Sequence, residues 1–147
     1  KFPSYESFKD ASITEIFTSE QLKDSYTLNT NTLASVVLMN QGDFKFEVQQ
    51  LPIEAQFSTV YAINAHDFDG DGDNDLVLGG NLYNVKPEVG RYDASYGLYL
   101  ENKGDGTFVT PEINSGFKLK GEVRDILIND KQLIISRNRD SLVIFKF

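Results

Sequence analysis

The sequence lacks cysteine altogether and contains a single histidine, His66, in 147 residues. Without cysteine the chain forms no disulfides, and cysteine usage gives no information on its redox compartment. A lone histidine excludes metal sites built from several imidazoles. No apolar run approaches the roughly 20 residues of a membrane-spanning helix, and no signal peptide is visible. Any metal site in this chain is therefore expected to use mainly oxygen ligands, and no membrane span is predicted.

Basic residues are outnumbered, because 14 Lys and Arg face 22 Asp and Glu and give a formal charge of −8. A nucleic-acid or anionic-membrane partner would require a clustered basic face, so the balance argues against both. The length suits one domain, and a hydrophobic content of 40% with 12% aromatic residues fits a packed globular protein. Because the chain begins with Lys1 rather than Met, we expect a processed or excised piece of a longer protein.

One stretch, residues 66–78, carries a dense acidic cluster. Five aspartates lie within nine residues, namely Asp67, Asp69, Asp71, Asp73 and Asp75. Like charges this close raise one another's pKa and repel unless a cation offsets them. Calcium takes about 6–8 oxygen ligands at roughly 2.3–2.6 Å and tolerates irregular geometry. The spacing predicts a calcium loop in which the first three aspartates and Asp75 offer carboxylates and Asp73 offers its backbone carbonyl, with a sharp turn at Gly72.

The flanking residues separate this loop from the EF-hand. An EF-hand needs a bidentate glutamate at the twelfth position and helices on both sides. The twelfth residue here is Leu78, and the neighbouring residues 60–63 and 76–78 are rich in β-formers. The loop is therefore predicted to join two strands. Two alternatives are a solvated acidic turn without an ion and magnesium, which demands stricter octahedral geometry.

The chain divides by pattern into residues 1–32, predicted to be helical, and residues 33–147, predicted to be strands. Serine and threonine caps followed by charged residues predict two short helices, at 4–10 and 19–25. Nine strands follow, separated by Gly, Asn and Asp turns. They are expected at 34–40, 44–51, 59–66, 75–80, 96–102, 107–113, 122–129, 132–137 and 141–147.

The strand region repeats at an offset of 62 residues, where residues 35–46 align with residues 96–108 through a shared Asn-x-Gly-Asp-x-x-Phe pattern. A repeat of this size with about four strands indicates a propeller blade. We therefore predict a mainly β protein, a partial β-propeller of about two four-stranded antiparallel blades with two short N-terminal helices. One complete blade spans about 57–113. A short Asn129-Asp130-Lys131 connection stands in the second copy where the first has its acidic loop.

The acidic loop and the Asn-x-Gly-Asp-Gly-x-Phe turn at residues 102–108 resemble FG-GAP/VCBS repeats of integrin-α-like propellers. The chain is also similar to the C-terminal part of bacterial UnbV/ASPIC-type repeat proteins. That similarity covers nearly the whole chain and is carried by Pro3-Ser4-Tyr5, Leu51-Pro52, Gly79-Gly80-Asn81, residues 90–97 and Ser115-Gly116-Phe117. The resemblance implies a Ca²⁺-binding propeller segment that is secreted, periplasmic or on the cell surface. Because residues 129–131 depart from the pattern, it implies one ion site.

Residues outside the acidic loop give weaker signals. Arg91, Tyr92 and Asp93 lie in the long insertion 81–95 and form a candidate recognition loop; the alternative is that Tyr92 packs the loop down while Arg91 pairs with an acid. His66 is expected to border the acidic loop rather than to act as a base. No nucleophile or carboxylate pair stands out, so the chain is expected not to be an enzyme, whatever the parent protein does.

Three functions fit these expectations. The first is a noncatalytic module for adhesion or protein–protein interaction, with calcium in a structural role. The second is a carbohydrate-binding or carbohydrate-active propeller that uses Tyr83, Tyr92, Tyr96 and Tyr99 as stacking faces. The third is a structural spacer. In each case the open blade edges need covering by a second copy or by further blades of a longer parent chain.

Overall fold

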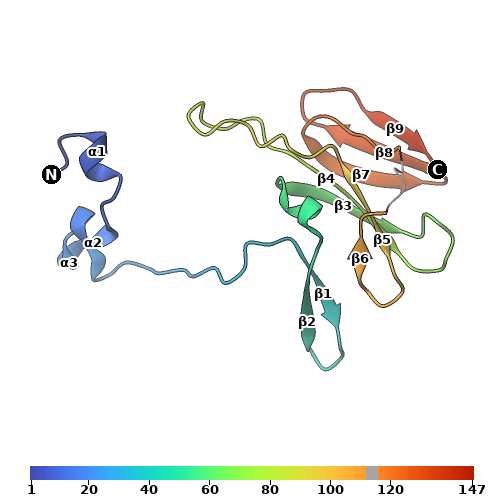
Figure 1. Ribbon diagram of the computed structural model, residues 1–147, viewed down its shortest axis with the longest axis horizontal. Coiled ribbons are helices and arrows are strands. Elements are labelled where there is room, and N and C mark those ends of the chain that lie inside the picture. The colour runs from blue at the N-terminus through green and yellow to red at the C-terminus, as the bar shows by residue number, and fades with distance from the viewer. Residues whose placement is uncertain (112–115) are drawn as a thin grey trace. The chain divides into compact units, whose positions relative to one another are not determined.

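A computed structural model describes residues 1–111 and 116–147 of the chain (Figure 1). These residues form two compact units, Lys1–Leu33 and Ala34–Phe147. Across the described ranges, nine strands in three antiparallel sheets accompany three short α-helices and one 3₁₀ turn. The prediction of a mainly β protein is confirmed. The three sheets do not close into a barrel or a propeller in the part of the chain that the structure describes.

The first unit contains three helices of four residues each. They are α1 (Tyr5–Phe8), α2 (Ile13–Ile16) and α3 (Ser19–Leu22). The helices predicted at 4–10 and 19–25 correspond to α1 and α3, which are shorter, but the predicted number of two was wrong. The missed helix α2 begins with a capping box, in which the Glu15 carboxylate accepts a 2.8 Å hydrogen bond from the Ser12 N–H. None of the three helices buries a residue, so local capping is the main stabilisation they show.

The second unit contains the strands and the 3₁₀ turn. They are β1 (Val36–Asn40), β2 (Phe46–Gln50), η1 (Ile53–Gln56), β3 (Val60–His66), β4 (Asp75–Gly80), β5 (Leu98–Asn102), β6 (Phe108–Val109), β7 (Val123–Asn129), β8 (Gln132–Arg137) and β9 (Val143–Lys146). The predicted bounds 75–80 and 132–137 match β4 and β8. The strand predicted at 107–113 is shorter, and its last two residues, like Ser115 of the quoted pattern, lie outside the described residues.

The strands pair in chain order into three sheets: β1-β2, β3-β4-β5-β6 and β7-β8-β9 (Figure 1). The second and third sheets share an irregularity in their first strand. The register of β3 against β4 shifts between Val60 and Ala62, and that of β7 against β8 shifts between Val123 and Asp125. The matching bulges make the two strand pairs equivalent, although residues 67–74 connect the first pair and only residues 130–131 connect the second.

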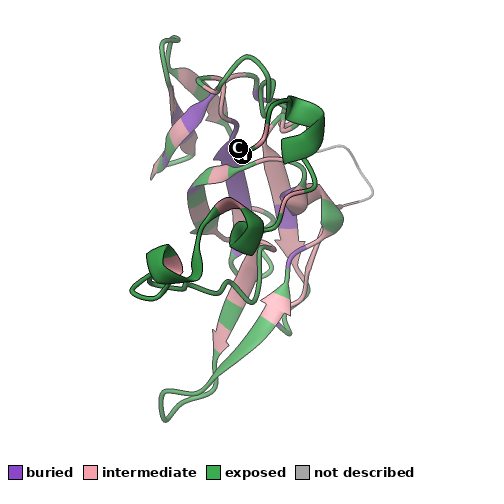
Figure 2. Ribbon diagram, turned by 90° about the vertical axis from the view of Figure 1, so that its left-hand side faces the viewer, coloured by how far each residue is buried: buried purple, intermediate pink, exposed green. Residues whose placement is uncertain are grey.

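The four-stranded sheet contributes to two hydrophobic cores, one on each face. On one face, Leu78 and Leu100 pack with Leu51 and Ala55, with Val37 of β1 against them. On the other face lies a larger cluster shared with the third sheet, made of Ala62, Val77, Leu119, Val123, Ile126, Leu133 and Ile135. Burying these side chains supplies the main driving force for folding. Buried residues are accordingly concentrated in the larger sheets (Figure 2).

Gly79 allows β4 and β7 to approach each other closely. A Cβ atom added at Gly79 would lie 2.5 Å from Cγ1 of Val123, well inside van der Waals contact. Val123 is 1% exposed and sits in the core shared by the two sheets. The close contact between these sheets therefore requires a residue without a side chain at position 79.

A buried polar network joins the end of β4 to the start of the third sheet. The Asn81 amide donates to the carbonyls of Ser95 (2.8 Å) and Gly121 (3.0 Å), and its oxygen accepts from the Ser58 hydroxyl (2.8 Å). Asn81 is 2% exposed and has a φ of +79°, which asparagine tolerates better than most residues. It therefore fixes three segments far apart in the sequence.

Glu122 holds the same junction through charge. Its carboxylate accepts hydrogen bonds from the Tyr83 N–H (2.7 Å), the Arg124 guanidinium (2.9 Å) and the Asn138 amide (2.9 Å). The Tyr83 N–H lowers the pKa of Glu122 most; burial opposes this, and Asn138 and Arg124 lower the pKa further, so that it lies below its ordinary value. The carboxylate is held in its ionised form by these donors.

We expect Asn81→Ala to lower the free energy of unfolding by at least about 2 kcal/mol, because each buried polar group left without a partner costs about 1–3 kcal/mol. Urea denaturation followed by circular dichroism measures the change. Asn84→Ala, at an exposed position of the same connection, is the matched control and should stay close to the native value. Equal losses in the two variants would contradict the role of Asn81.

The lowered pKa of Glu122 predicts a pH dependence of stability. Its contribution is complete above the ordinary pKa of 4.5 and is lost as the pH falls through the lower pKa of the folded state. In Glu122→Gln this contribution is missing, so the free energy of unfolding should fall less steeply on acidification than in the native chain. The exposed Glu88→Gln variant should follow the native profile. Parallel profiles for all three proteins would refute the assignment.

Candidate metal centre

The acidic loop, residues 67–74, connects β3 to β4 and is curled by its own aspartates. The Asp67 carboxylate accepts hydrogen bonds from the N–H groups of Gly70 (2.7 Å) and Gly72 (3.1 Å). Both glycines have positive φ, +84° and +99°, which residues with side chains rarely adopt. Asp69 and Asp71 each accept the N–H two residues ahead. The loop thus winds around its own carboxylates.

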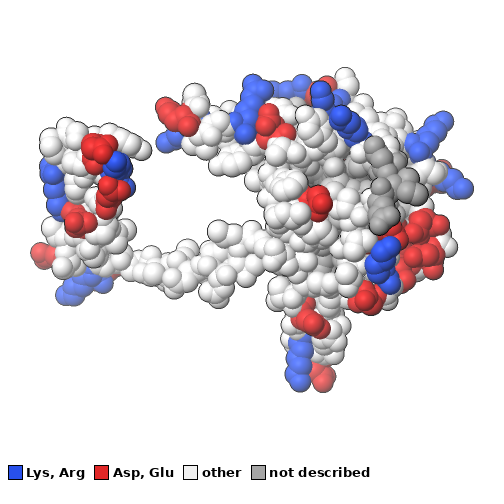
Figure 3. Space-filling model, viewed as in Figure 1, with Lys and Arg blue, Asp and Glu red and all other residues white. Residues whose placement is uncertain are grey.

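This winding brings three of the predicted ligands together. One carboxylate oxygen from each of Asp67, Asp69 and Asp71 lies within 4.8 Å of the others. The hydrogen bond from the Asp71 N–H lowers the pKa of Asp69, but desolvation and the neighbouring carboxylates together raise it above its ordinary value. Acidic atoms gather over this loop on the surface shown in Figure 3. Such a group of exposed oxygens can hold a metal ion.

Asp75 lies outside this triad and is fully buried. Its carboxylate accepts hydrogen bonds from the Phe68 N–H (3.2 Å), the Tyr99 hydroxyl (2.8 Å) and the Asn102 N–H (2.9 Å). Burial raises the pKa of Tyr99, and its hydrogen bond to the negative carboxylate raises it further. A carboxylate has about four acceptor sites, so these donors leave about one for an ion. Asp75 chiefly anchors the loop to β5.

The Asn-x-Gly-Asp turn between β5 and β6 braces the acidic loop. The Asn102 amide donates to the Asn74 carbonyl at 3.1 Å, and the Gly104 N–H donates to the Asn102 amide oxygen at the same distance. The equivalent turn between β1 and β2 repeats this last bond, from Gly42 to Asn40 at 2.8 Å. The repeated asparagine in the sequence predicted the turn, but no neighbouring residue indicated that Asn102 would also bond to the acidic loop.

Asp73, predicted to offer its backbone carbonyl, points its carboxylate toward the same turn. A Cβ atom built on Gly104 would lie 2.9 Å from Oδ2 of Asp73. Glycine at position 104, with a φ of +79°, therefore leaves room for the acidic loop as well as forming the turn. Of the five aspartates, three form the triad, one is buried and bonded to β5, and one faces the neighbouring turn.

The predicted recognition loop occupies the connection between β4 and β5. Leu82 and Tyr92 form an isolated antiparallel bridge, so this connection folds back on itself. The Arg91 guanidinium lies over the Tyr83 ring at 5.2 Å from its centroid, in a cation–π contact. Tyr92 is 46% exposed and Asp93 is also exposed. Both side chains are therefore accessible at the surface.

His66 lies at the border of the acidic loop, as its position in the sequence indicated, and it packs among aromatic rings. Its ring meets those of Phe68 and Phe147 edge-on, with centroid distances of 5.1 and 5.3 Å. The ring of Phe68 in turn meets that of Tyr99. A single aromatic chain therefore links the end of β3, the acidic loop and β5.

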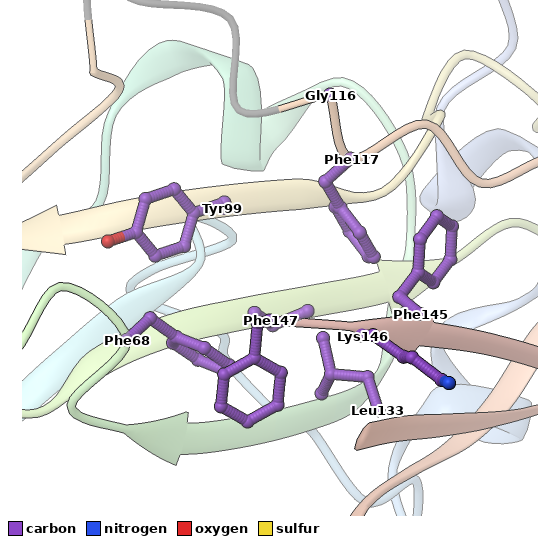
Figure 4. A pocket seen from close by; sticks show the side chains of 9 residues that line it. Phe68, Tyr99, Gly116, Phe117, Leu133, Phe145, Lys146 and Phe147 are labelled. Carbon is purple, nitrogen blue, oxygen red and sulfur yellow. The ribbon is translucent and has the colours of Figure 1, made fainter. Parts of the chain in front are cut away.

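The rings of Phe68, Tyr99 and Phe147 line one side of a pocket of about 380 Å³ between the second and third sheets. Phe145 and Phe147 come from the last strand and the C-terminal residue, while Phe68 comes from the acidic loop (Figure 4). The pocket wall is mainly apolar, and Lys146 is its charged member. The acidic loop thus contributes Phe68 to this pocket, and Tyr99, which donates to Asp75, lines it as well.

We expect Tyr99→Phe to lower the free energy of unfolding by about 1.5–3 kcal/mol, the usual worth of a hydrogen bond to a charged group. The substitution keeps the ring and removes only the hydroxyl that donates to Asp75. Thermal and urea unfolding measure the change. The matched control is Tyr96→Phe, at a residue that is 47% exposed. If the two variants lose the same stability, the hydrogen bond from Tyr99 to Asp75 contributes no measurable stability, and the prediction fails.

Comparison with known proteins gives no match to family models, to curated proteins or to solved structures. The resemblance to FG-GAP/VCBS repeats therefore rests on the sequence patterns quoted above. Within the described residues, no helix combines the length and the hydrophobicity needed to cross a membrane.

Proposed function

We propose that the chain is a noncatalytic, calcium-binding β-propeller segment in which the ion has a structural role. The observation that carries the proposal is the convergence of Asp67, Asp69 and Asp71 within 4.8 Å, in a loop that joins two paired strands. Three carboxylates at this spacing repel one another, and a divalent cation relieves that repulsion.

The donor set fits calcium. All three side chains of the triad are hard oxygen ligands, and the exposed positions of Asp69 and Asp71 leave room for water to complete a shell of about 6–8 oxygens. Backbone carbonyls of the loop, including that of Asp73, are further oxygen donors. Magnesium fits less well, because it requires near-ideal octahedral geometry. The absence of histidine and cysteine from the triad argues against zinc.

The contacts of the loop support a structural role for the ion. Asp67 immediately follows β3, and Asp75 begins β4, so an ion bound by the triad lies beside the end of this strand pair. The buried Asp75 carries the effect to β5 through its bonds to Tyr99 and Asn102. Bound calcium therefore stabilises the end of three adjacent strands rather than a single turn.

The propeller part of the proposal is supported by how the sheets repeat. The second and third sheets carry the same bulge in their first strand, and the turns at Gly42 and Gly104 share one hydrogen-bond pattern. The four-stranded sheet has the strand order of a complete blade, and the hairpin β1-β2 and the third sheet pack on its two faces. Radial stacking of such units is how propellers bury both faces of each sheet.

A location outside the cytoplasm suits this site. Extracellular calcium modules bind the ion at roughly 10⁻⁴–10⁻³ M, which matches calcium concentrations outside cells. We therefore place the chain in a secreted, periplasmic or surface protein of a bacterium, where it serves adhesion or another protein–protein contact. The accessible Tyr92 and Asp93 are the candidate contact residues.

Carbohydrate binding has less support as the function. Stacking on sugars needs an open aromatic face, but Arg91 lies over the Tyr83 ring and Lys118 lies over the Tyr96 ring. Tyr99 uses its hydroxyl to hold Asp75. Of the four tyrosines considered for stacking, Tyr92 is the one at which none of these contacts occurs.

Calcium should raise the midpoint of thermal unfolding, and EDTA should lower it to the metal-free value. Ligand that binds only the folded state adds about 2.7 kcal/mol at a concentration 100 times its Kd. Asp69→Asn should remove most of this response, because it takes one charge from the triad. Isothermal titration with Ca²⁺ and Mg²⁺ measures the affinities directly.

The matched control is Asp43→Asn, in the turn between β1 and β2 and away from the triad. Asp43 has a φ of +48°, a conformation that asparagine also adopts. This variant should keep the full calcium response. An unchanged midpoint in excess calcium, or an equal loss of response in both variants, would overturn the proposed ion site.

A further inference from the structure

The face of the four-stranded sheet that contacts the third sheet contains a row of residues in direct register. Asn64 pairs with Val77, and Val77 pairs with Tyr99. Val77 is 2% exposed and lies in the core shared with the third sheet, against which Tyr99 also packs. The Asn64 amide donates to the Ile126 carbonyl of β7 at 3.0 Å. The four-stranded sheet therefore contacts the third sheet through this row.

The third sheet has an equivalent row on its outer face. The shared bulge aligns β3 with β7 and β4 with β8, so that Leu127 and Ile134 stand where Asn64 and Val77 stand in the second sheet. Leu127 pairs with Ile134, and Ile134 pairs with Ile144. Leu127 and Ile144 are each 56% exposed. We call Leu127, Ile134 and Ile144 the outer face.

The hairpin β1-β2 exposes a second apolar face. Val37 points to the core of the four-stranded sheet, and Gln49 donates to the Thr107 hydroxyl on the same side. The opposite side carries Leu38, which pairs directly with Val48, and Phe46 two pairs further along. Leu38, Phe46 and Val48 are 57%, 54% and 61% exposed, respectively. We call these three residues the hairpin face.

We propose that a second copy of this chain packs its hairpin face on the outer face of the first. Both sheet-to-sheet contacts within the chain join one side of a sheet to the opposite side of the next sheet in chain order. The outer face matches the side of a sheet that contacts the next sheet, and the hairpin face matches the side that contacts the preceding one. Both faces are uncovered, and one chain carries both. The six residues are all apolar, so the contact removes hydrophobic surface from water.

Such a contact is head-to-tail, because each copy uses two different surfaces. Head-to-tail contacts close into rings when the rotation between copies allows it and otherwise extend into open assemblies. The inference rests on the stacked sheets of the proposed function and does not require the metal ion. With a charge of −8 on each copy, repulsion opposes association at low ionic strength, so moderate salt should favour assembly.

Two variants that each block one face test the inference. The first, Leu127→Lys with Ile144→Glu, places charges on the outer face. The second, Leu38→Lys with Val48→Glu, places an opposite-charge pair at directly paired positions of the hairpin face, which preserves the hairpin. Both variants change residues that are more than half exposed, and circular dichroism with thermal unfolding verifies that each remains folded. Val89→Lys, at a 60% exposed residue of the β4–β5 connection, is the control.

Light scattering coupled to size-exclusion chromatography gives the molar mass of each sample. The native chain and the control should form assemblies of at least two copies, while each blocked variant alone should remain a monomer. An equimolar mixture of the two blocked variants should form a dimer and nothing larger, because one free hairpin face then meets one free outer face. This rescue by mixing is unique to a head-to-tail contact.

Three results would overturn the inference. They are a native chain that stays monomeric at every concentration, self-association of either blocked variant alone, and a mixture that contains only monomers. Measurements in calcium and in EDTA separate this outcome from the ion site. If calcium raises the unfolding midpoint but no assembly forms, the docking inference alone fails. If assemblies form but calcium has no effect on unfolding, the ion site alone fails.

Discussion

The buried carboxylate of Asp75 is the interaction on which the centre of the fold depends. It begins β4, is fully buried and accepts three hydrogen bonds from the loop and from β5. Burying a carboxylate costs free energy unless hydrogen-bond donors compensate for the water it loses. The acidic loop, the Tyr99 ring and the start of the β5–β6 turn are therefore arranged around one side chain, and the same loop carries the triad.

Much of the strand order follows from local patterns. The alternation of apolar residues and the Gly, Asn and Asp turns predicted β4 and β8 with the bounds that the structure has, and the aspartate spacing located the triad. Partners distant in the sequence could not be predicted in this way. The bond from Tyr99 to Asp75 spans 24 residues, and the bond from Asn81 to Gly121 spans 40. These depend on how sheets pack, which no local pattern encodes. Helix α2 was missed although its capping box was visible.

Polar and apolar contacts join the sheets at different places. Hydrophobic side chains fill the space between facing strands, whereas Asn81 and Glu122 tie together the segments that enter and leave those strands. Every buried side-chain nitrogen or oxygen among the described residues has a hydrogen-bond partner. Gly79 adds a steric requirement, because the sheets approach too closely there for any side chain. The sequence is thus most constrained at the junctions between sheets.

The two equivalent strand pairs differ in their connections, residues 67–74 in one and residues 130–131 in the other. The same register and the same bulge survive this difference of six residues. Strands of this kind therefore pair without an acidic loop, and the loop is an insertion in the hairpin of β3 and β4. A short insertion or deletion at one hairpin tip can then add or remove the acidic loop without changing the strand pairing, and the shorter hairpin is a natural place into which to transplant it.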